Sequence, residues 1–420
     1  MSSVPLGPDV ATVLEETLRA QWGRLLALLA VRFRRLDLAE DALADAFEAA
    51  ARTWPAEGVP ANPPAWLFTA ARRRILDRLR VESVAARKER LLVVDAALAS
   101  APVMADPGGL IADERLRLVF LCAHPVLAPE NAAALTLRLV LGIPTADVAA
   151  LFHVPEATMA ARLTRAKRRV ADAGVPFVVP EAPARAERLD TVAEVAYLTF
   201  TAGYAPATGE AAIRRELADA AVRLVRTLRE LMPGEPVVET LLALVLLQHS
   251  RRDARTDAAG TLVLLPDQDR SRWHRAEIEE ALAILTPLVT TEVSGPAQSY
   301  LLQGLIAAEH AIAPSAPATR WGVIAAHYAE LEQLMGSPVV RLNHAVAVAE
   351  ARGPADGLAL LEGLEDRLPR SHRLPAVRGE LLSRLGDVVG ARAEFDLAIE
   401  RCANTAEVAL LRERRARPTD

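Results

Sequence analysis

The sequence predicts an all-α protein in which two small helical domains, the second with a helix-turn-helix, precede a C-terminal helical-repeat domain. Three observations predict this class. Ala, Leu, Arg, Val and Glu are the commonest residues while aromatic residues make up only 4%, β-branched runs are rare, and apolar residues recur at helical spacing. At 420 residues the chain is too long for one typical domain.

Composition also excludes some classes of protein. The start "MSSVPLGPDV" lacks the basic and apolar segments of a signal peptide. No apolar run reaches the roughly 18 residues that a membrane span needs. Cys122 and Cys402 form no disulfide framework. We therefore expect a cytoplasmic protein with no membrane contact.

Charge is distributed unevenly. Residues 1–175 hold 22 Lys and Arg against 20 Asp and Glu, a net charge of +2, and the remainder, with 27 against 34, carries −7. A basic-leaning first part and an acidic second part suggest different partners.

The first strong helical pattern covers residues 37–54. Asp37 is expected to cap this helix, with Glu40 completing a capping box. An apolar stripe and a charged stripe run along different faces, and the side chain of Asp45 should be exposed. The two stripes are Leu43, Phe47, Ala50 and Trp54, and Asp41, Asp45, Glu48 and Arg52.

A second helix is predicted over residues 62–80. Asn62 can cap it, and Pro63 suits the first turn because its missing N–H is not needed there. The residues expected to face inward are Phe68, Ala71, Ile75 and Leu79. Those expected to point elsewhere include Trp66, Arg72, Arg73, Arg74 and Arg78.

Breaks in these patterns divide the chain. Residues 81–111, with "APVMADPGGL", are predicted to be a linker before a second helical block at 112–173. The Pro-rich segment 174–185 is expected to be a semi-rigid connection. Helices separated by Pro and Gly breaks then fill residues 190–420.

The segment "VPEATMAARLTRAKRRV" (154–170) predicts the second helix of a helix-turn-helix. The first helix would cover about Thr145–Leu151, His153 would lie in the turn in a left-handed conformation, and Pro155 would open the second helix. The expected buried stripe is Met159, Leu163, Ala166 and Val170. On the opposite side lie Thr158, Arg162, Arg165 and Arg169. Such a helix suits the DNA major groove, with Lys167 and Arg168 meeting phosphates, although a solvated basic face is the alternative.

The tail predicts a helical repeat. Residues 379–400 place small and apolar residues as a tetratricopeptide repeat does, so that two helices pack closely. Gly353 precedes Gly386 by 33 residues, which is near the period of that repeat. The positions concerned are Gly379, Leu382, Gly386, Ala391, Phe395 and Ala398.

Neither catalysis nor a metal site is predicted. Cys122 and His124 in "LCAHP" have no second pair at zinc spacing. In "DQDR", Asp267 and Asp269 lack a nearby cluster that completes a site. We expect one of them to cap the helix that begins near Arg270, with Trp273 packed beneath it. No catalytic residue, metal or cofactor is therefore expected.

Taken together, residues 10–172 resemble the extracytoplasmic-function (ECF) sigma factors of bacterial RNA polymerase. The motifs "LDLAEDALADAF", "PPAWLFTAARRRILDRLR" and "VPEATMAARLTRAKRRV" stand in that family's order and spacing. The stretches "LCAHPVLAPENAAALTLRLVLGI" and "LVLLPDQDRSRWHRAEI" resemble one group within it, whose members carry a long helical, tetratricopeptide-like extension.

The resemblance implies domains and roles. It implies a region 2 domain at 10–80, a linker at 81–111, a region 4 domain at 112–173 and a C-terminal domain at 190–420. The implied polymerase-binding residues, on the β′ clamp helices, are Asp41, Asp45, Phe47 and Glu48, and the β subunit is a further partner. Contacts to the minus-ten promoter element are implied for Trp66, Arg72, Arg73, Arg74 and Arg78. Contacts to the minus-thirty-five element are implied for Thr158, Arg162, Arg165, Lys167, Arg168 and Arg169.

Several positions depart from the family pattern. Arg73 stands where Asn is frequent, which changes the expected minus-ten preference. Ala160 and Ala161 replace residues that often contact bases. In the extension, Thr201 and Ala202 replace an amide and a carboxylate.

The function predicted from all this is an alternative sigma factor that confers promoter choice on core polymerase. Its acidic C-terminal domain would regulate it in cis by binding its own sigma domains. The alternative is a helix-turn-helix regulator with a repeat domain that does not bind polymerase as a sigma factor.

Overall fold

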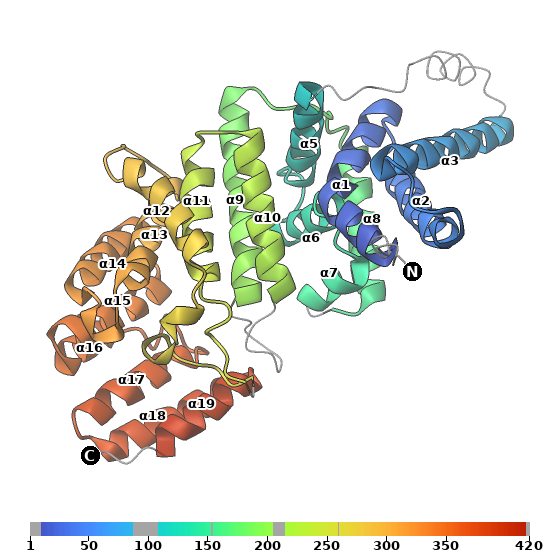
Figure 1. Ribbon diagram of the computed structural model, residues 1–420. Coiled ribbons are helices and arrows are strands. Elements are labelled where there is room, and N and C mark those ends of the chain that lie inside the picture. The colour runs from blue at the N-terminus through green and yellow to red at the C-terminus, as the bar shows by residue number, and fades with distance from the viewer. Residues whose placement is uncertain (1–9, 87–107, 153, 205–214, 259, 417–420) are drawn as a thin grey trace, which may run out of the picture. The chain divides into compact units, whose positions relative to one another are not determined.

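The computed structural model describes residues 10–86, 108–152, 154–204, 215–258 and 260–416 (Figure 1). Every regular element of these residues is a helix, and Thr256 and Leu262 form an isolated β-bridge. The all-helical prediction is therefore confirmed. The chain divides into two compact units, residues 1–195 and 196–420.

The first unit combines what the sequence predicts as two separate domains. Helix α1 packs against α2, α3 and α5, and it also touches α6. Trp22, Leu26 and Leu29 of α1 are buried in the resulting core. The helices are α1 (Val10–Phe33), α2 (Leu36–Glu57), α3 (Pro63–Ala86), α5 (Gly108–Cys122), α6 (Pro129–Leu139), α7 (Thr145–Leu151) and α8 (Glu156–Asp172).

The predicted helix starts are partly wrong. The cap of α2 is Arg35, and Asp37 lies in the first turn, where its carboxylate pairs with the Arg35 guanidinium at 2.9 Å. The side-chain hydrogen bond outweighs burial and lowers the pKa of Asp37. For α3 the prediction is confirmed, because the Ala65 N–H donates to Asn62 Oδ1 at 3.1 Å.

The predicted linker is shorter at both ends. Helix α3 continues to Ala86 and α5 begins at Gly108, so 81–86 and 108–111 are helical. Residues 87–107 lie outside the described part of the chain. The predicted connection at 174–185 is also shortened, since α9 (Ala182–Tyr204) starts within it and contains the boundary between the two units.

The second unit is a succession of helices that pack in sequential pairs (Figure 1). Four of them, α11, α13, α15 and α16, begin with a proline in the first turn, at Pro236, Pro296, Pro338 and Pro354, which is where the predicted breaks fall. Its α-helices after α9 are α10 (Arg215–Leu231), α11 (Pro236–His249), α12 (Arg275–Leu288), α13 (Pro296–Ile312), α14 (Trp321–Met335), α15 (Pro338–Arg352), α16 (Pro354–Leu361), α17 (Arg373–Arg384), α18 (Val388–Arg401) and α19 (Thr405–Ala416). Three 3-10 turns, at Leu265–Asp267, Arg270–Arg272 and Ala316–Ala318, join some of them.

The repeat-like tail forms the expected close helix pair. A Cβ atom on Gly379 of α17 would lie only 3.1 Å from the Ala391 carbonyl oxygen of α18. Between the helices Gly386 adopts φ 83°, which favours glycine. Phe395 and Ala398 are buried in the small core that this pair forms. Membership of the tetratricopeptide family remains a prediction.

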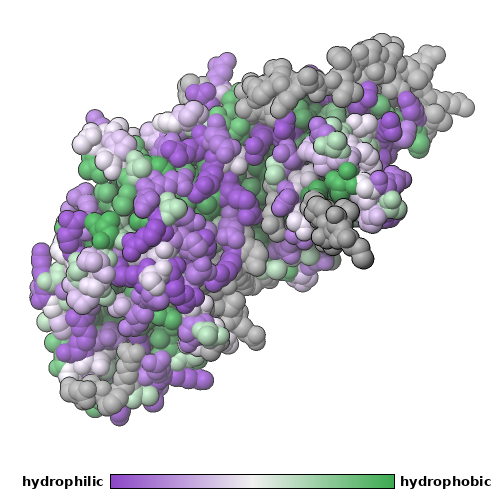
Figure 2. All heavy atoms as spheres, viewed as in Figure 1, coloured by the Kyte–Doolittle hydropathy of each residue, from purple (hydrophilic) through white to green (hydrophobic). Residues whose placement is uncertain are grey.

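The surface of the described residues is mainly polar. Figure 2 shows charged and hydrophilic residues over much of this view, with hydrophobic areas between them. No described helix combines the length and the apolar character that crossing a membrane requires.

Candidate nucleic-acid interface

Helices α7 and α8 form the predicted helix-turn-helix. Helix α7 has the predicted bounds, and α8 begins one residue later than expected because Pro155 is its N-cap. His153 lies outside the described residues, so its predicted turn conformation is untested. The stripe predicted to be buried is confirmed at every position: Met159, Leu163, Ala166 and Val170.

The opposite face of α8 is basic. Thr158, Arg165 and Arg169 are exposed, and Arg168 is 81% exposed beside Asp172 at 3.5 Å. Arg162 is half-buried, with its guanidinium 5.8 Å from the ring centroid of Phe152. A hollow of about 200 Å³ gathers three of these arginines, and its lining is Leu127, Asn131, Arg162, Arg165, Ala166 and Arg169. Three guanidinium groups around one hollow suit a negatively charged backbone.

Helix α3 carries the second predicted DNA-binding face. Trp66 is half-buried and meets the Trp54 ring edge-on at a centroid distance of 5.5 Å. Arg73 is exposed, and Arg72 is half-buried. Arg74 and Arg78 do not project freely, because both pair with Asp45, at 2.9 Å and 3.1 Å.

Comparison with known proteins identifies both parts. Residues 18–84 match sigma-70 region 2, and residues 117–170 match sigma-70 region 4. The chain belongs to the sigma-70 family. Residues 188–288 match a family of unknown function, DUF6596. An uncharacterized protein of Rhizobium meliloti (strain 1021) is 43% identical over 386 residues, covering 90% of each chain.

In this sigma-70 family protein a buried carboxylate joins region 2 to region 4. The side chain of Glu40 on α2 is 8% exposed, and it receives Arg138 Nε at 2.8 Å and Lys167 Nζ at 2.7 Å. Glu40 therefore does not close a capping box. The Lys167 ammonium points toward α2 rather than with the exposed arginines of α8, so in this arrangement it is not presented to DNA.

Two glycines allow region 2 and region 4 to pack closely against each other. A Cβ atom on Gly23 of α1 would lie 2.2 Å from the Val140 carbonyl oxygen, and one on Gly142 would lie 2.6 Å from the Trp22 ring. Arg138 lies over the same Trp22 ring at 4.8 Å. The sequence does offer one signal, because Arg138 is a lone cation within the apolar run "AALTLRLVLG" and such a charge needs a partner.

The face of α2 predicted to bind polymerase is partly engaged within region 2. Asp45 is only 32% exposed and pairs with Arg74 and Arg78, so the expectation of an exposed side chain is wrong. Asp41 also pairs with Arg78, at 3.3 Å. Phe47 contacts Trp22 at a ring distance of 5.8 Å. Glu48 remains open, being 68% exposed and only 3.8 Å from Arg52 within its own helix.

The remaining candidate groups have local structural partners. Burial raises the pKa of the Cys122 thiol. Asp269 caps the 3-10 turn at Arg270 by accepting from the Ser271 N–H at 2.9 Å, and Trp273 is buried, as the sequence predicts. In the described residues His372, Cys402 and Glu407 lie close enough to share a metal ion, but His372 Nε2 already bonds Glu407 Oε2 at 2.7 Å.

Proposed function

We propose that this chain is an alternative sigma factor of the ECF type, which binds core RNA polymerase and directs it to promoters. The observation that carries the proposal is the region 4 helix α8, with a fully buried apolar stripe opposite exposed Arg165, Arg168 and Arg169. A region 2 domain with its own arginine-rich helix accompanies it. The motifs that resemble the ECF group, and the long helical extension, support the finer assignment.

The residues divide into three roles. Arg162, near the N-terminal half of α8, reads base edges of the minus-thirty-five element, while Arg165, Arg168 and Arg169 hold phosphates. On α3, Trp66, Arg72, Arg73, Arg74 and Arg78 receive the minus-ten element, where bases leave the stack. On α2, Glu48 with Asp41, Asp45 and Phe47 meets the β′ clamp helices, and the β subunit is a second contact.

Promoter binding then requires the first unit to open. The two promoter elements are separated by roughly 25 base pairs, or about 85 Å at 3.4 Å per base pair. Helices α2 and α8 instead meet at one carboxylate, Glu40. Opening breaks the ion pair between Glu40 and Lys167, and it frees Lys167 to contact a phosphate.

We further propose that the C-terminal domain regulates the sigma domains in cis. Its net charge of −7 is opposite in sign to the +2 of residues 1–175. A tethered domain acts at an effective concentration of about a millimolar, so even a weak interaction is populated. Membership of the tetratricopeptide family would give it a surface suited to such binding.

Transcription in vitro with purified core polymerase and genomic fragments tests the function. We expect promoter-specific transcripts that depend on the full-length protein. Residues 1–175 in the same assay test regulation, and inhibition in cis predicts tighter promoter binding by the shorter protein, with a difference that shrinks as salt rises.

A helix-turn-helix regulator that does not act as a sigma factor is distinguished by polymerase pull-down. DNA binding without any association with core polymerase would refute the sigma-factor proposal. If residues 1–175 are folded but inactive in transcription, the C-terminal domain activates the sigma domains rather than inhibiting them.

A further inference from the structure

The second unit buries an arginine that has no carboxylate partner. Arg251 follows the C-terminus of α11 and is 8% exposed. Its guanidinium donates to the Tyr204 hydroxyl at 2.7 Å and to the Gln248 side-chain carbonyl, both of which are neutral. Hydrogen bonds to neutral groups satisfy its donors but do not balance its charge.

Two more arginines converge on the same place. The Arg255 guanidinium stacks on the Tyr204 ring at 3.7 Å, and Tyr204 in turn stacks on Phe200 at 5.4 Å. Arg270 lies 4.4 Å from the Trp273 ring centroid, and its Nη1 donates to the carbonyl oxygens of His310 and Ala313, which are uncharged, at 2.7 Å and 2.9 Å. The aromatic faces hold these cations in place without neutralising them.

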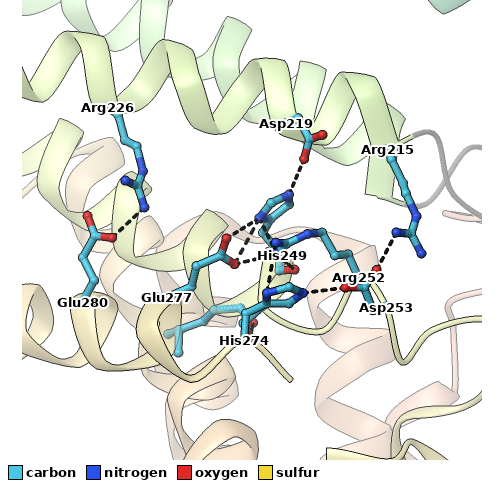
Figure 3. A network of polar contacts seen from close by, with 11 residues as sticks. Arg215, Asp219, Arg226, His249, Arg252, Asp253, His274, Glu277 and Glu280 are labelled. Atoms are coloured by element: carbon cyan, nitrogen blue, oxygen red, sulfur yellow. Dashed lines mark hydrogen bonds and ion pairs between the residues drawn. The ribbon is translucent and has the colours of Figure 1, made fainter. Parts of the chain in front are cut away.

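Three carboxylates of the same unit, Asp219, Asp253 and Glu277, are engaged with other partners. Figure 3 shows His249 between Asp219 and Glu277, at 2.7 Å and 3.0 Å, with Arg252 also donating to Glu277. Asp253 is held by His274 and Arg215. We define the arginine cluster as Arg251, Arg255 and Arg270. In the described part of the chain no acidic side chain pairs with any guanidinium group of this cluster.

The environment of the cluster is electrostatically unfavourable as it stands. Burial lowers the pKa of Arg251, Tyr204 opposes this change, and the charge of Arg255 adds to it. Burial together with Arg251 and Arg270 lowers the pKa of His310 to about 4, so His310 is neutral at pH 7. Two buried donors of this group also lack a hydrogen-bond partner among the described residues, Arg255 Nε and Trp273 Nε1.

We propose that the cluster of Arg251, Arg255 and Arg270 is a binding site for a small phosphate-bearing ligand. A phosphate dianion matches the excess positive charge, and its oxygens accept from guanidinium groups in bidentate geometry. Arg255 and Arg270 are only partly buried and provide access, whereas Arg251 provides the buried charge. The site goes beyond the proposed sigma-factor function, and its test needs neither polymerase nor DNA.

Calorimetric titration and thermal unfolding of the full-length protein test the site, with inorganic phosphate and pyrophosphate as probes and chloride balancing the ionic strength. We expect measurable heat and a rise of several degrees in the unfolding midpoint at millimolar phosphate. The conservative variant Arg255→Gln should weaken binding at least tenfold, because it removes a partly exposed cation while Tyr204 and Arg251 remain. Citrate is the comparison ligand that carries carboxylates instead of phosphate, and we expect it to bind more weakly than pyrophosphate.

Arg226→Gln is the matched control, since Arg226 lies on α10 of the same unit and pairs with Glu280 at 2.6 Å. It should bind phosphate as the wild type does. Absence of phosphate binding by the wild-type protein would overturn the proposal. An equal effect of phosphate on the wild type, Arg255→Gln and Arg270→Gln would also overturn it, because it would show a general ion effect. Citrate binding that exceeds phosphate binding and is lost in Arg255→Gln would overturn the choice of phosphate.

Discussion

The two units of the molecule bury charge in opposite ways. In the first unit the Glu40 carboxylate is buried between two cations, Arg138 and Lys167, that come from different helices. In the second unit Arg251 is equally buried and meets only neutral partners and other arginines. A buried charge with its partners fixes how helices meet, whereas a buried charge without them leaves an attraction for an ion from outside.

Two histidines of the second unit have pKa values shifted in opposite directions. Near Arg251, burial together with the positive charges of Arg251 and Arg270 lowers the pKa of His310 and keeps it neutral. Two residues before Arg251, burial disfavours the charged form of His249, but the hydrogen bonds to Asp219 and Glu277 outweigh it and raise the pKa of His249. The same unit therefore holds one histidine with a raised pKa and one with a lowered pKa.

The largest effect is expected from removing the buried carboxylate of the first unit. Glu40→Ala leaves two cations facing each other, and we expect a loss of about 3–5 kcal/mol in the free energy of unfolding. Denaturant unfolding followed by circular dichroism measures it. Glu48→Ala on the same helix removes an exposed pair and should cost at most about 0.5 kcal/mol. Equal effects of the two changes would show that Glu40 does not hold the unit together.

The second expectation concerns the acid limb of stability. Because the pKa of His310 is lower in the folded than in the unfolded state, the unfolded state binds this proton more readily. The contribution of His310 to the free energy of unfolding is therefore complete above about pH 6.5 and is lost as the pH falls toward 4. We expect about 3 kcal/mol from this group. His310→Phe keeps a ring against Trp321 but cannot titrate, so its stability should fall less steeply between pH 6.5 and 4. Parallel pH profiles would contradict the assignment.

A smaller loss in the free energy of unfolding is expected from a change where region 2 meets region 4. Gly23→Ala places a methyl group against the Val140 carbonyl and should destabilise the closed arrangement by about 1–3 kcal/mol. Gly322→Ala in α14, where a Cβ would meet nothing, is the control. If opening is required for function, Gly23→Ala also increases association with core polymerase. Unchanged stability would show that the contact adapts freely.

Two arginines of α8, the half-buried Arg162 and the exposed Arg168, are expected to contact DNA in different ways. Arg162→Ala should cost about 1–3 kcal/mol at one base pair of the minus-thirty-five element. Arg168→Ala should weaken all sequences alike and flatten the salt dependence. Titrations with point-mutated promoters separate the two patterns. A uniform loss from Arg162→Ala would remove it from base reading.

The smallest effect on stability is expected at the face of α2 that is predicted to bind polymerase. Glu48→Arg reverses an exposed charge and should change the free energy of unfolding by less than about 0.5 kcal/mol. Association with core polymerase should nevertheless weaken. Glu57→Arg, at the end of the same helix, is the control for added charge. Normal association of Glu48→Arg would exclude this side chain from the interface.

What the sequence could predict was set by the distance between interacting residues. The buried stripe of α8 and the Asn62 cap follow from residues three or four positions apart, and both are confirmed. The Asp37 cap was wrong because Arg35, two residues away, competes for its carboxylate. Glu40 invited a local explanation, yet its partners lie 98 and 127 residues further along. Likewise, nothing local indicates that Arg251 lacks a carboxylate.

The central claim is that a sigma factor opens between α2 and α8 when it binds polymerase. Distance measurement between spin labels tests it, using Ala51→Cys on α2 and Ala171→Cys on α8, both exposed, in a full-length Cys402→Ser background. The account predicts one short distance in the free protein and a much longer one after core polymerase and promoter DNA are added. A distance that stays short in the polymerase complex, or no complex at all, would contradict it.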